Sequence, residues 1–188
     1  MRAILCVLLA AFIPPALGDA ALVRQLREGG YVLYMRHAST DFSQNDARMT
    51  SYEDCASQRN LTDKGRAEAR SVAPHLSRLR IPVDTVLASP FCRTMETARL
   101  AFGKAQATNE VRGGPARPED PARYAPLRRL LSSPVKKANL VIVSHGNPFH
   151  AVAGPPYLAE GEIAVVRPMG QDFRVVGRIR IEDWPLLD

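Results

Sequence analysis

The sequence YVLYMRHAST, residues 31–40, contains an apolar, strand-like run that stops at two side chains suited to chemistry. The run follows Gly29-Gly30, a pair that ends the helix predicted before it. Its near-continuous apolar character predicts a strand buried on both faces, as in a sheet covered by helices. Arg36 and His37 then place a cation next to a titratable nucleophile at the carboxyl end of this strand.

Two later apolar runs end in a similar way. VDTVLA (83–88) is followed by Ser89-Pro90-Phe91-Cys92-Arg93, and NLVIV (139–143) is followed by Ser144-His145-Gly146-Asn147. In open sheets of parallel strands, sites form beyond the carboxyl ends of the strands. Adjacent strands lie about 5 Å apart, so we expect the three endings to meet in one pocket that holds two histidines and two arginines.

Helical segments separate these strands along the chain. Helices are predicted over 19–28, 61–80 and 122–133, and residues 89–103 are predicted to form a turn that leads into a helix ending at Gly103. Thr62 is the predicted N-cap of the second helix, with a kink or break at Pro74. A weak strand is predicted near 108–111, and residues 162–168 and 172–181 resemble two strands joined by a turn. This alternation predicts a three-layer α/β/α domain with a mainly parallel central sheet and antiparallel strands at its C-terminal edge.

Residues 1–18, MRAILCVLLAAFIPPALG, have the layout of a secretory signal peptide. Arg2 precedes an apolar run that is too short to span a membrane comfortably, and prolines and small residues follow it. We expect cleavage after Gly18 or Ala20, with an uncleaved anchor as the alternative. Residues 19–188 suit a single domain, which we expect to be secreted to the periplasm without stable membrane insertion.

Two cysteines remain after cleavage, Cys55 and Cys92. An even pair in an oxidising compartment predicts a disulfide, and the alternative is two buried thiols. Two cysteines at this spacing match no usual zinc pattern, so we expect no metal site.

The chain carries a formal net charge of +6. This balance favours anionic partners. The basic residues are scattered and are not interleaved with aromatic side chains, which argues against nucleic-acid binding. The sequence does not indicate an oligomeric state.

A pocket with two arginines and two histidines is suited to a phosphoryl group. The planar guanidinium of arginine binds phosphate oxygens in bidentate pairs, and two arginines neutralise a dianion. An imidazole attacks phosphorus only when it is neutral, and nearby guanidinium charges disfavour its protonation.

Four motifs in order resemble the histidine phosphatase superfamily, which has the phosphoglycerate-mutase-like fold. MRHAST carries the Arg-His motif, with Ala38 where the family usually has glycine, and RNLTDKGRAEA resembles the family's Leu-Thr-x-x-Gly helix start. ASPFCRTMETA matches the Ser-Pro-x-x-Arg-x-x-x-Thr-Ala segment, and VSHG matches the motif of the second histidine. These matches run from residue 31 to residue 146 and cover most of the mature chain.

The resemblance implies a role for each matching residue. His37 would be the nucleophile that forms a phosphohistidine, and Arg36, Arg93 and His145 would complete the phosphate pocket and stabilise charge on the transferring group. Thr40 matches a position that often carries a hydroxyl or amide and would add a phosphate hydrogen bond, with Ser43 as a weaker candidate. Water would then release phosphate, with no metal or organic cofactor.

The four motifs do not identify a proton donor. Hydrolysis of a phosphomonoester benefits from one, because an alkoxide is a poor leaving group unless it is protonated. Many family members supply a carboxylate after the second arginine, where this sequence diverges. Glu110 is the first candidate, followed by Glu119 and Asp120, while Glu162 and Asp41 are remote ones. Some compact relatives lack the acid and act on phosphohistidine.

The sequence therefore predicts a cofactor-independent phosphohydrolase of the histidine acid phosphatase type. Its substrate would be a phosphorylated small molecule, a phosphorylated envelope component or phosphohistidine. The alternative is a phosphate-binding or interaction module that has lost turnover, which the replacement of glycine by Ala38 motivates.

Overall fold

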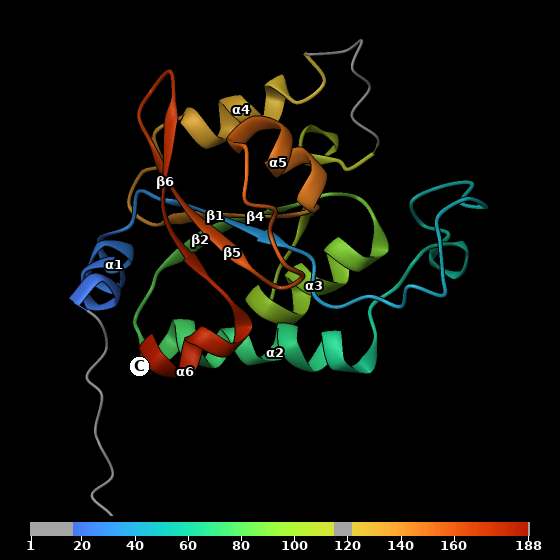
Figure 1. Ribbon diagram of the computed structural model, residues 1–188, viewed down its shortest axis with the longest axis horizontal. Helices are drawn as coiled ribbons and strands as arrows, with labels where there is room; N and C mark the ends of the chain where they lie inside the picture. The colour runs from blue at the N-terminus through green and yellow to red at the C-terminus, as the bar shows by residue number, and fades with distance from the viewer. Residues whose placement is uncertain (1–16, 115–121, 188) are drawn as a thin grey trace, which may run out of the picture.

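A computed structural model describes residues 17–114 and 122–187 of the chain (Figure 1). Residues 1–16 of the predicted signal peptide lie outside this range, as do Glu119 and Asp120. The α-helices are α1 (Leu17–Glu28), α2 (Asp63–Arg78), α3 (Cys92–Phe102), α4 (Ala125–Ser132), α5 (Gly146–Ala153) and α6 (Trp184–Leu187). The strands are β1 (Val32–Arg36), β2 (Val83–Ala88), β3 (Gln106–Ala107), β4 (Asn139–Ser144), β5 (Ile163–Pro168) and β6 (Phe173–Ile179). Three short 3-10 turns are η1 (Cys55–Ser57), η2 (Asn109–Val111) and η3 (Ile181–Asp183).

The strands form one twisted sheet in the order β3-β2-β4-β1-β5-β6 (Figure 1). The first four strands of that order run parallel, and β5 and β6 are antiparallel to their neighbours. The predicted fold class is confirmed, including the antiparallel hairpin at the C-terminal edge.

Helices cover both faces of the sheet. In Figure 1, α4 and α5 lie on one side of the strands, and α2 and α6 lie on the other. Strand β1 shows why, since successive side chains of a strand point to opposite faces. Leu33 and Met35 pack in one buried cluster, and Val32 and Tyr34 pack in the other.

Within the described part of the chain, no helix has the length and apolar character needed to cross a membrane.

Helix α2 begins at the predicted cap, because the Thr62 hydroxyl accepts a hydrogen bond from the Gly65 amide at 3.0 Å. Of the kink or break predicted at Pro74, the break is wrong, since α2 runs through this residue to Arg78. Pro74 lies on the exposed side of the helix, where water can satisfy the carbonyl that proline leaves without a donor.

Two further boundaries differ from the prediction. The weak strand expected near 108–111 is wrong, because β3 ends at Ala107 and the chain then forms η2. The Thr108 hydroxyl accepts from the Glu110 amide and so caps this turn. Helix α4 begins at Ala125, because Pro126 in the first turn favours a helix start. Helix α5, which directly follows His145, was not predicted.

Candidate active site

The three strand endings meet at one edge of the sheet, as predicted. β1 and β4 pair in register up to Arg36 and Ser144. Beyond them, the His37 amide donates to the Ser144 carbonyl at 2.9 Å, and the Ser89 amide donates to the Val143 carbonyl at 3.0 Å. The backbone ladder thus continues one residue past the strands and places the chemically active side chains side by side.

The two histidines lie close together in the interior. The ring centroids of His37 and His145 are 5.4 Å apart, in an edge-to-face arrangement. His145 is held on three sides: its Nε2 lies 2.9 Å from the Ser89 hydroxyl, its carbonyl accepts from the Tyr34 hydroxyl, and its ring edge meets Phe91. The His145 ring therefore has little freedom to turn.

His37 is a neutral imidazole at neutral pH. Its side chain is almost fully buried, and this burial lowers its pKa to about 3, while the charges of Arg93 and Arg36 act in the same direction against a carbonyl that raises it. That carbonyl belongs to Ala38 and lies 2.9 Å from Nδ1. Because a carbonyl only accepts, Nδ1 carries the proton and Nε2 keeps its lone pair.

His145 is neutral for the same reason. Burial lowers the pKa of His145 well below its ordinary value, and the neighbouring His37 and Arg93 lower it further.

Ala38, which replaces the usual glycine, is fully buried and its amide donates to the Thr97 hydroxyl at 3.2 Å. The methyl group is accommodated in the core.

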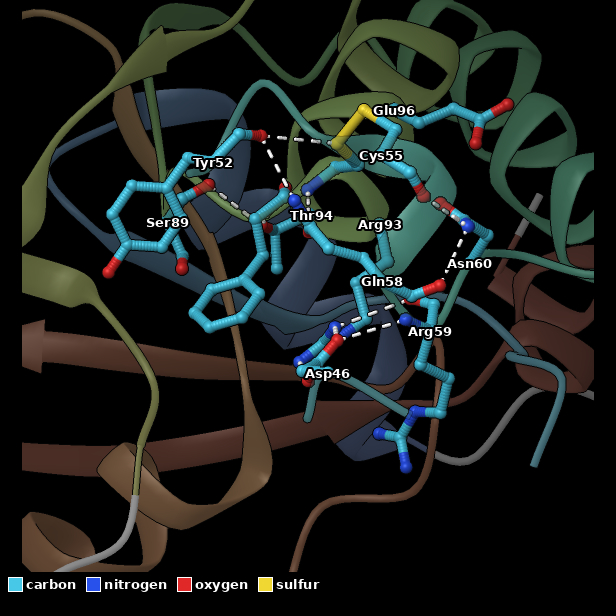
Figure 2. Close-up of a disulfide and its surroundings, with 12 residues drawn as sticks. Asp46, Tyr52, Cys55, Gln58, Arg59, Asn60, Ser89, Arg93, Thr94 and Glu96 are labelled. Carbon is cyan, nitrogen blue, oxygen red and sulfur yellow. Dashed lines mark hydrogen bonds and ion pairs between the residues drawn. A yellow bond between two sulfur atoms is a disulfide. The ribbon is translucent and has the colours of Figure 1, made fainter. Parts of the chain in front are cut away.

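Arg93 extends from the first turn of α3 and forms an ion pair with Asp46. Its two terminal nitrogens donate to the two Asp46 carboxylate oxygens at 2.9 and 3.0 Å, and Figure 2 shows the two groups facing each other. The guanidinium also lies 4.5 Å from the centre of the Phe91 ring. Burial lowers the pKa of Arg93, and the Asp46 charge opposes that change.

Arg36 is held by the segment that precedes β5. One terminal nitrogen donates to the Leu158 carbonyl at 2.8 Å, and the other lies 3.4 Å from a Glu160 carboxylate oxygen. Its guanidinium lies 5.3 Å from the centre of the Tyr157 ring. The same glutamate accepts from the Thr40 hydroxyl at 2.7 Å, so it ties the loop after β1 to this arginine.

These side chains surround a cavity of about 320 Å³. Its walls carry both histidines, three arginines, one carboxylate and two aromatic rings. The lining residues are Arg36, His37, Asp46, Arg59, Phe91, Arg93, Gly114, His145, Gly146, Asn147 and Tyr157. A larger cleft of about 890 Å³ shares none of these residues and contains neither histidine. The smaller cavity is therefore the candidate active site.

The other sequence candidates lie elsewhere. Thr40 is buried and turned to Glu160, outside the cavity lining. Ser43 and Asp41 bond each other at the surface, which lowers the pKa of Asp41. Glu162 is buried and paired with an arginine of β6 at 2.7 Å.

Glu110, the first candidate for the proton donor, is exposed on η2. Among the contacts of the described residues, none joins its carboxylate to either histidine. In the described ranges, 17–114 and 122–187, no three His, Cys, Asp or Glu side chains gather closely enough to hold a metal ion.

The predicted disulfide between Cys55 and Cys92 is confirmed, with Cα atoms 5.7 Å apart. It ties the irregular segment 41–60 to the start of α3, next to Arg93 (Figure 2). The buried side chain of Gln58 reinforces this connection, because its oxygen accepts from the Cys92 amide at 2.9 Å.

Sequence reasoning missed the charged residues that this segment brings to the cavity, Asp46 and Arg59, and also missed Glu160. The cysteine pair was a usable signal for the first two. A bridge from Cys55 to the residue before Arg93 places segment 41–60 beside the second arginine of the pocket.

A family model described as the histidine phosphatase superfamily (branch 1) matches residues 32–114. Among curated proteins, no sequence matches this chain. Among solved structures, the protein histidine phosphatase SixA in complex with tungstate is similar with 20% identity and a TM-score of 0.54, over 81% of this chain and 98% of that chain.

Two other solved structures are similar. Open reading frame Rv3214 from Mycobacterium tuberculosis has 18% identity and a TM-score of 0.58, over 78% of this chain and 95% of that chain. A phosphoserine phosphatase from Entamoeba histolytica, in complex with 3-phosphoglyceric acid, has 13% identity and a TM-score of 0.56, over 79% and 95%. At these identities the likeness shows a shared fold. The family model and the shared fold together support the histidine phosphatase superfamily for this chain.

Proposed function

We propose that this protein is a phosphohydrolase that acts through a phosphohistidine on His37, without a cofactor. The observation that carries the proposal is a buried, neutral imidazole whose Nδ1 is bound to a carbonyl, in the same cavity as Arg36 and Arg93. Burial and the nearby guanidinium charges keep the imidazole unprotonated, and the same charges attract a phosphate dianion.

The chemistry takes two steps. The lone pair on Nε2 of His37 attacks phosphorus, a P–N bond forms, and the bond from phosphorus to the leaving oxygen breaks. Water then attacks the phosphohistidine, the P–N bond breaks, and inorganic phosphate leaves. Arg36, Arg93 and His145 stabilise the charge that develops on the phosphoryl oxygens.

The leaving oxygen takes a proton, and Glu110 remains the first candidate donor from the sequence. An aryl phosphate with a good leaving group needs this proton less than an alkyl phosphate does. If Glu110 is the donor, Glu110→Gln slows alkyl phosphate hydrolysis much more than aryl phosphate hydrolysis. Equal rates for the variant and the wild type on both substrates would remove Glu110 from the mechanism.

The substrate class is a phosphorylated small molecule, an envelope component or phosphohistidine. The experiment is a hydrolysis panel with aryl phosphate, alkyl phosphates and a phosphohistidine peptide, run on the wild type, His37→Ala and His150→Ala. His150 is exposed on α5 and serves as the matched control. We expect His37→Ala to lose turnover together with the acid-labile phosphoryl label, and the His150 variant to keep both.

Robust turnover by His37→Ala would refute the mechanism. Saturable phosphate binding without hydrolysis of any panel member would instead support a binding module.

We also propose that residues 1–18 direct export and that the mature domain works in the periplasm. The disulfide near the cavity supports this location, because such bonds persist in oxidising compartments. Fractionation of cells that express the full chain, with mass spectrometry of its N-terminus, tests export and the cleavage position together. Full-length protein retained in the cytoplasm would contradict this proposal.

A further inference from the structure

The cavity contains a third arginine that the motifs do not include. Arg36 and Arg93 each have a carboxylate partner, Glu160 and Asp46 respectively. Arg59 lines the same cavity, and within the described part of the chain no carboxylate pairs with its guanidinium. It therefore adds a positive charge to the site that the described residues do not neutralise.

The backbone of Arg59 is fixed against the other charged groups. Its amide donates to an Asp46 carboxylate oxygen at 2.9 Å, and its carbonyl accepts from a terminal nitrogen of Arg93 at 3.3 Å. Figure 2 shows these three residues close together, and all three line the cavity. The backbone of Arg59 is thus hydrogen-bonded directly to Arg93, the second arginine of the pocket.

The residues on either side are anchored as firmly. Gln58 is buried and bonded to the Cys92 amide, and the Asn60 side chain donates to the Cys55 carbonyl at 2.8 Å. Arg59 lies between these two anchors in the chain. A side chain held by a rigid backbone loses less entropy when it binds a ligand.

The side chain itself is left available. Among the described residues, no hydrogen bond uses the guanidinium of Arg59, and its Nε is buried without a partner. One face of the guanidinium is covered by the Phe42 ring, whose centre lies 4.9 Å away. Stacking of this kind leaves the in-plane N–H groups free to form a bidentate pair with an oxyanion. A buried donor without a protein partner calls for an explanation, and a ligand is one.

Arg93, by contrast, has much of its donor capacity in use. Its guanidinium has five N–H groups, and three of its hydrogen bonds go to Asp46 and to the Arg59 carbonyl. Two N–H groups remain for a ligand. A phosphoryl group with three oxygens in this cavity therefore needs donors besides those of Arg93.

We propose that Arg59 is a third phosphate-binding arginine, whose guanidinium binds oxygens of the phosphoryl group and of the inorganic phosphate product. This inference rests on the proposed function, because it assigns a further ligand for the same phosphoryl group. The charge of Arg59 also acts on both histidines, where it helps to lower their pKa values.

The test measures binding of inorganic phosphate and orthovanadate by calorimetry, on wild type, Arg59→Ala, Arg59→Lys and Arg48→Ala. Arg48 lies in the same segment, is exposed, and is the matched control for loss of one positive charge. We expect Arg59→Ala to weaken both affinities about 10- to 100-fold, the range for a lost charge-assisted pair. Arg59→Lys should lose less affinity than Arg59→Ala, because lysine keeps the positive charge but lacks the planar pair of N–H donors of the guanidinium. Arg48→Ala stays within about twofold.

Unchanged phosphate affinity in Arg59→Ala or in Arg59→Lys relative to wild type would overturn the inference. An equal loss in Arg48→Ala would do so too, because it would show a general charge effect. Urea unfolding of each variant establishes that it is folded, and Arg59→Lys carries the comparison if Arg59→Ala does not fold.

These readouts separate the inference from the proposed function. Wild-type hydrolysis together with unchanged phosphate affinity in Arg59→Ala refutes only the role of Arg59. Phosphate binding that depends on Arg59, without hydrolysis of any panel member, supports that role and refutes the hydrolase.

Discussion

The fold should lose stability in mild acid because of its buried neutral histidines. The perturbation is His37→Gln, which keeps a polar side chain but cannot take up a proton between pH 8 and pH 5. Burial lowers the pKa of His37 to about 3, whereas an unfolded chain has the ordinary value near 6.5. The unfolded state therefore binds more protons than the folded state between these two values. Stability is fully present above pH 6.5 and is lost as the pH falls toward 3.

The magnitude follows from the two pKa values. At pH 5 the medium lies about 1.5 units below the unfolded value and well above the folded value, and each unit is worth about 1.36 kcal/mol. His37 should therefore remove about 2 kcal/mol from the free energy of unfolding between pH 8 and pH 5. His145 acts in the same direction, because burial lowers its pKa as well.

The assay is urea unfolding at pH 8 and pH 5, followed by circular dichroism. The drop in unfolding free energy should be smaller in His37→Gln than in the wild type by about 2 kcal/mol. His150→Gln is the control, because it replaces an exposed histidine with the same side chain. Parallel pH dependences of wild type and His37→Gln would show that folding does not lower the pKa of His37, and would refute the argument from burial.

Three further outcomes are expected. Reduction of the Cys55–Cys92 bridge, which closes a sequence separation of 37 residues, should lower the free energy of unfolding by about 3–4 kcal/mol, as seen in urea midpoints. Gly113→Ala places a Cβ within 2.4 Å of the His145 ring, so turnover should fall at least about tenfold as the ring is displaced. Asn139→Ala removes three hydrogen bonds to backbone groups, two buried and one partly buried, and should cost about 3 kcal/mol of unfolding free energy.

Each outcome has its own control. Reductant should not change the unfolding free energy of a variant that lacks both Cys55 and Cys92. A loss of unfolding free energy equal to that of the wild type would show that the reductant acts at another part of the protein. Gly103→Ala has open space around its Cβ but a positive φ, so it should lower stability without lowering turnover. A drop in turnover equal to that of Gly113→Ala would contradict displacement of His145. A loss below about 1 kcal/mol for Asn139→Ala would show that its bonds are replaced by water.

Much of the fold could be predicted from local patterns. The runs at 31–35, 83–88 and 139–143 are mostly apolar, with Asp84, Thr85 and Asn139 as the polar exceptions, and a sheet covered on both faces buries strands of this kind. Local chemistry also located Thr62 as a cap and Gly103 as a helix end, which the structure confirms.

Local patterns failed where the surroundings override them. Pro74 looked like a helix break, but it lies on the exposed face, and the packing of the opposite face holds the helix together. The strand expected near 108–111 gave way to a 3-10 turn, because the Thr108 hydroxyl caps the Glu110 amide.

The sequence alone determined the chemical identity of the site, because Arg36-His37, Arg93 and His145 each follow a buried strand and parallel strands deliver their carboxyl ends to one edge. Only the tertiary structure decided which charges surround them. Asp46 and Arg59 come from an irregular segment with no periodic pattern, and they reach the cavity because a disulfide and buried side-chain hydrogen bonds hold that segment against α3. Such contacts depend on how distant parts of the chain close in space, which local spacing does not encode.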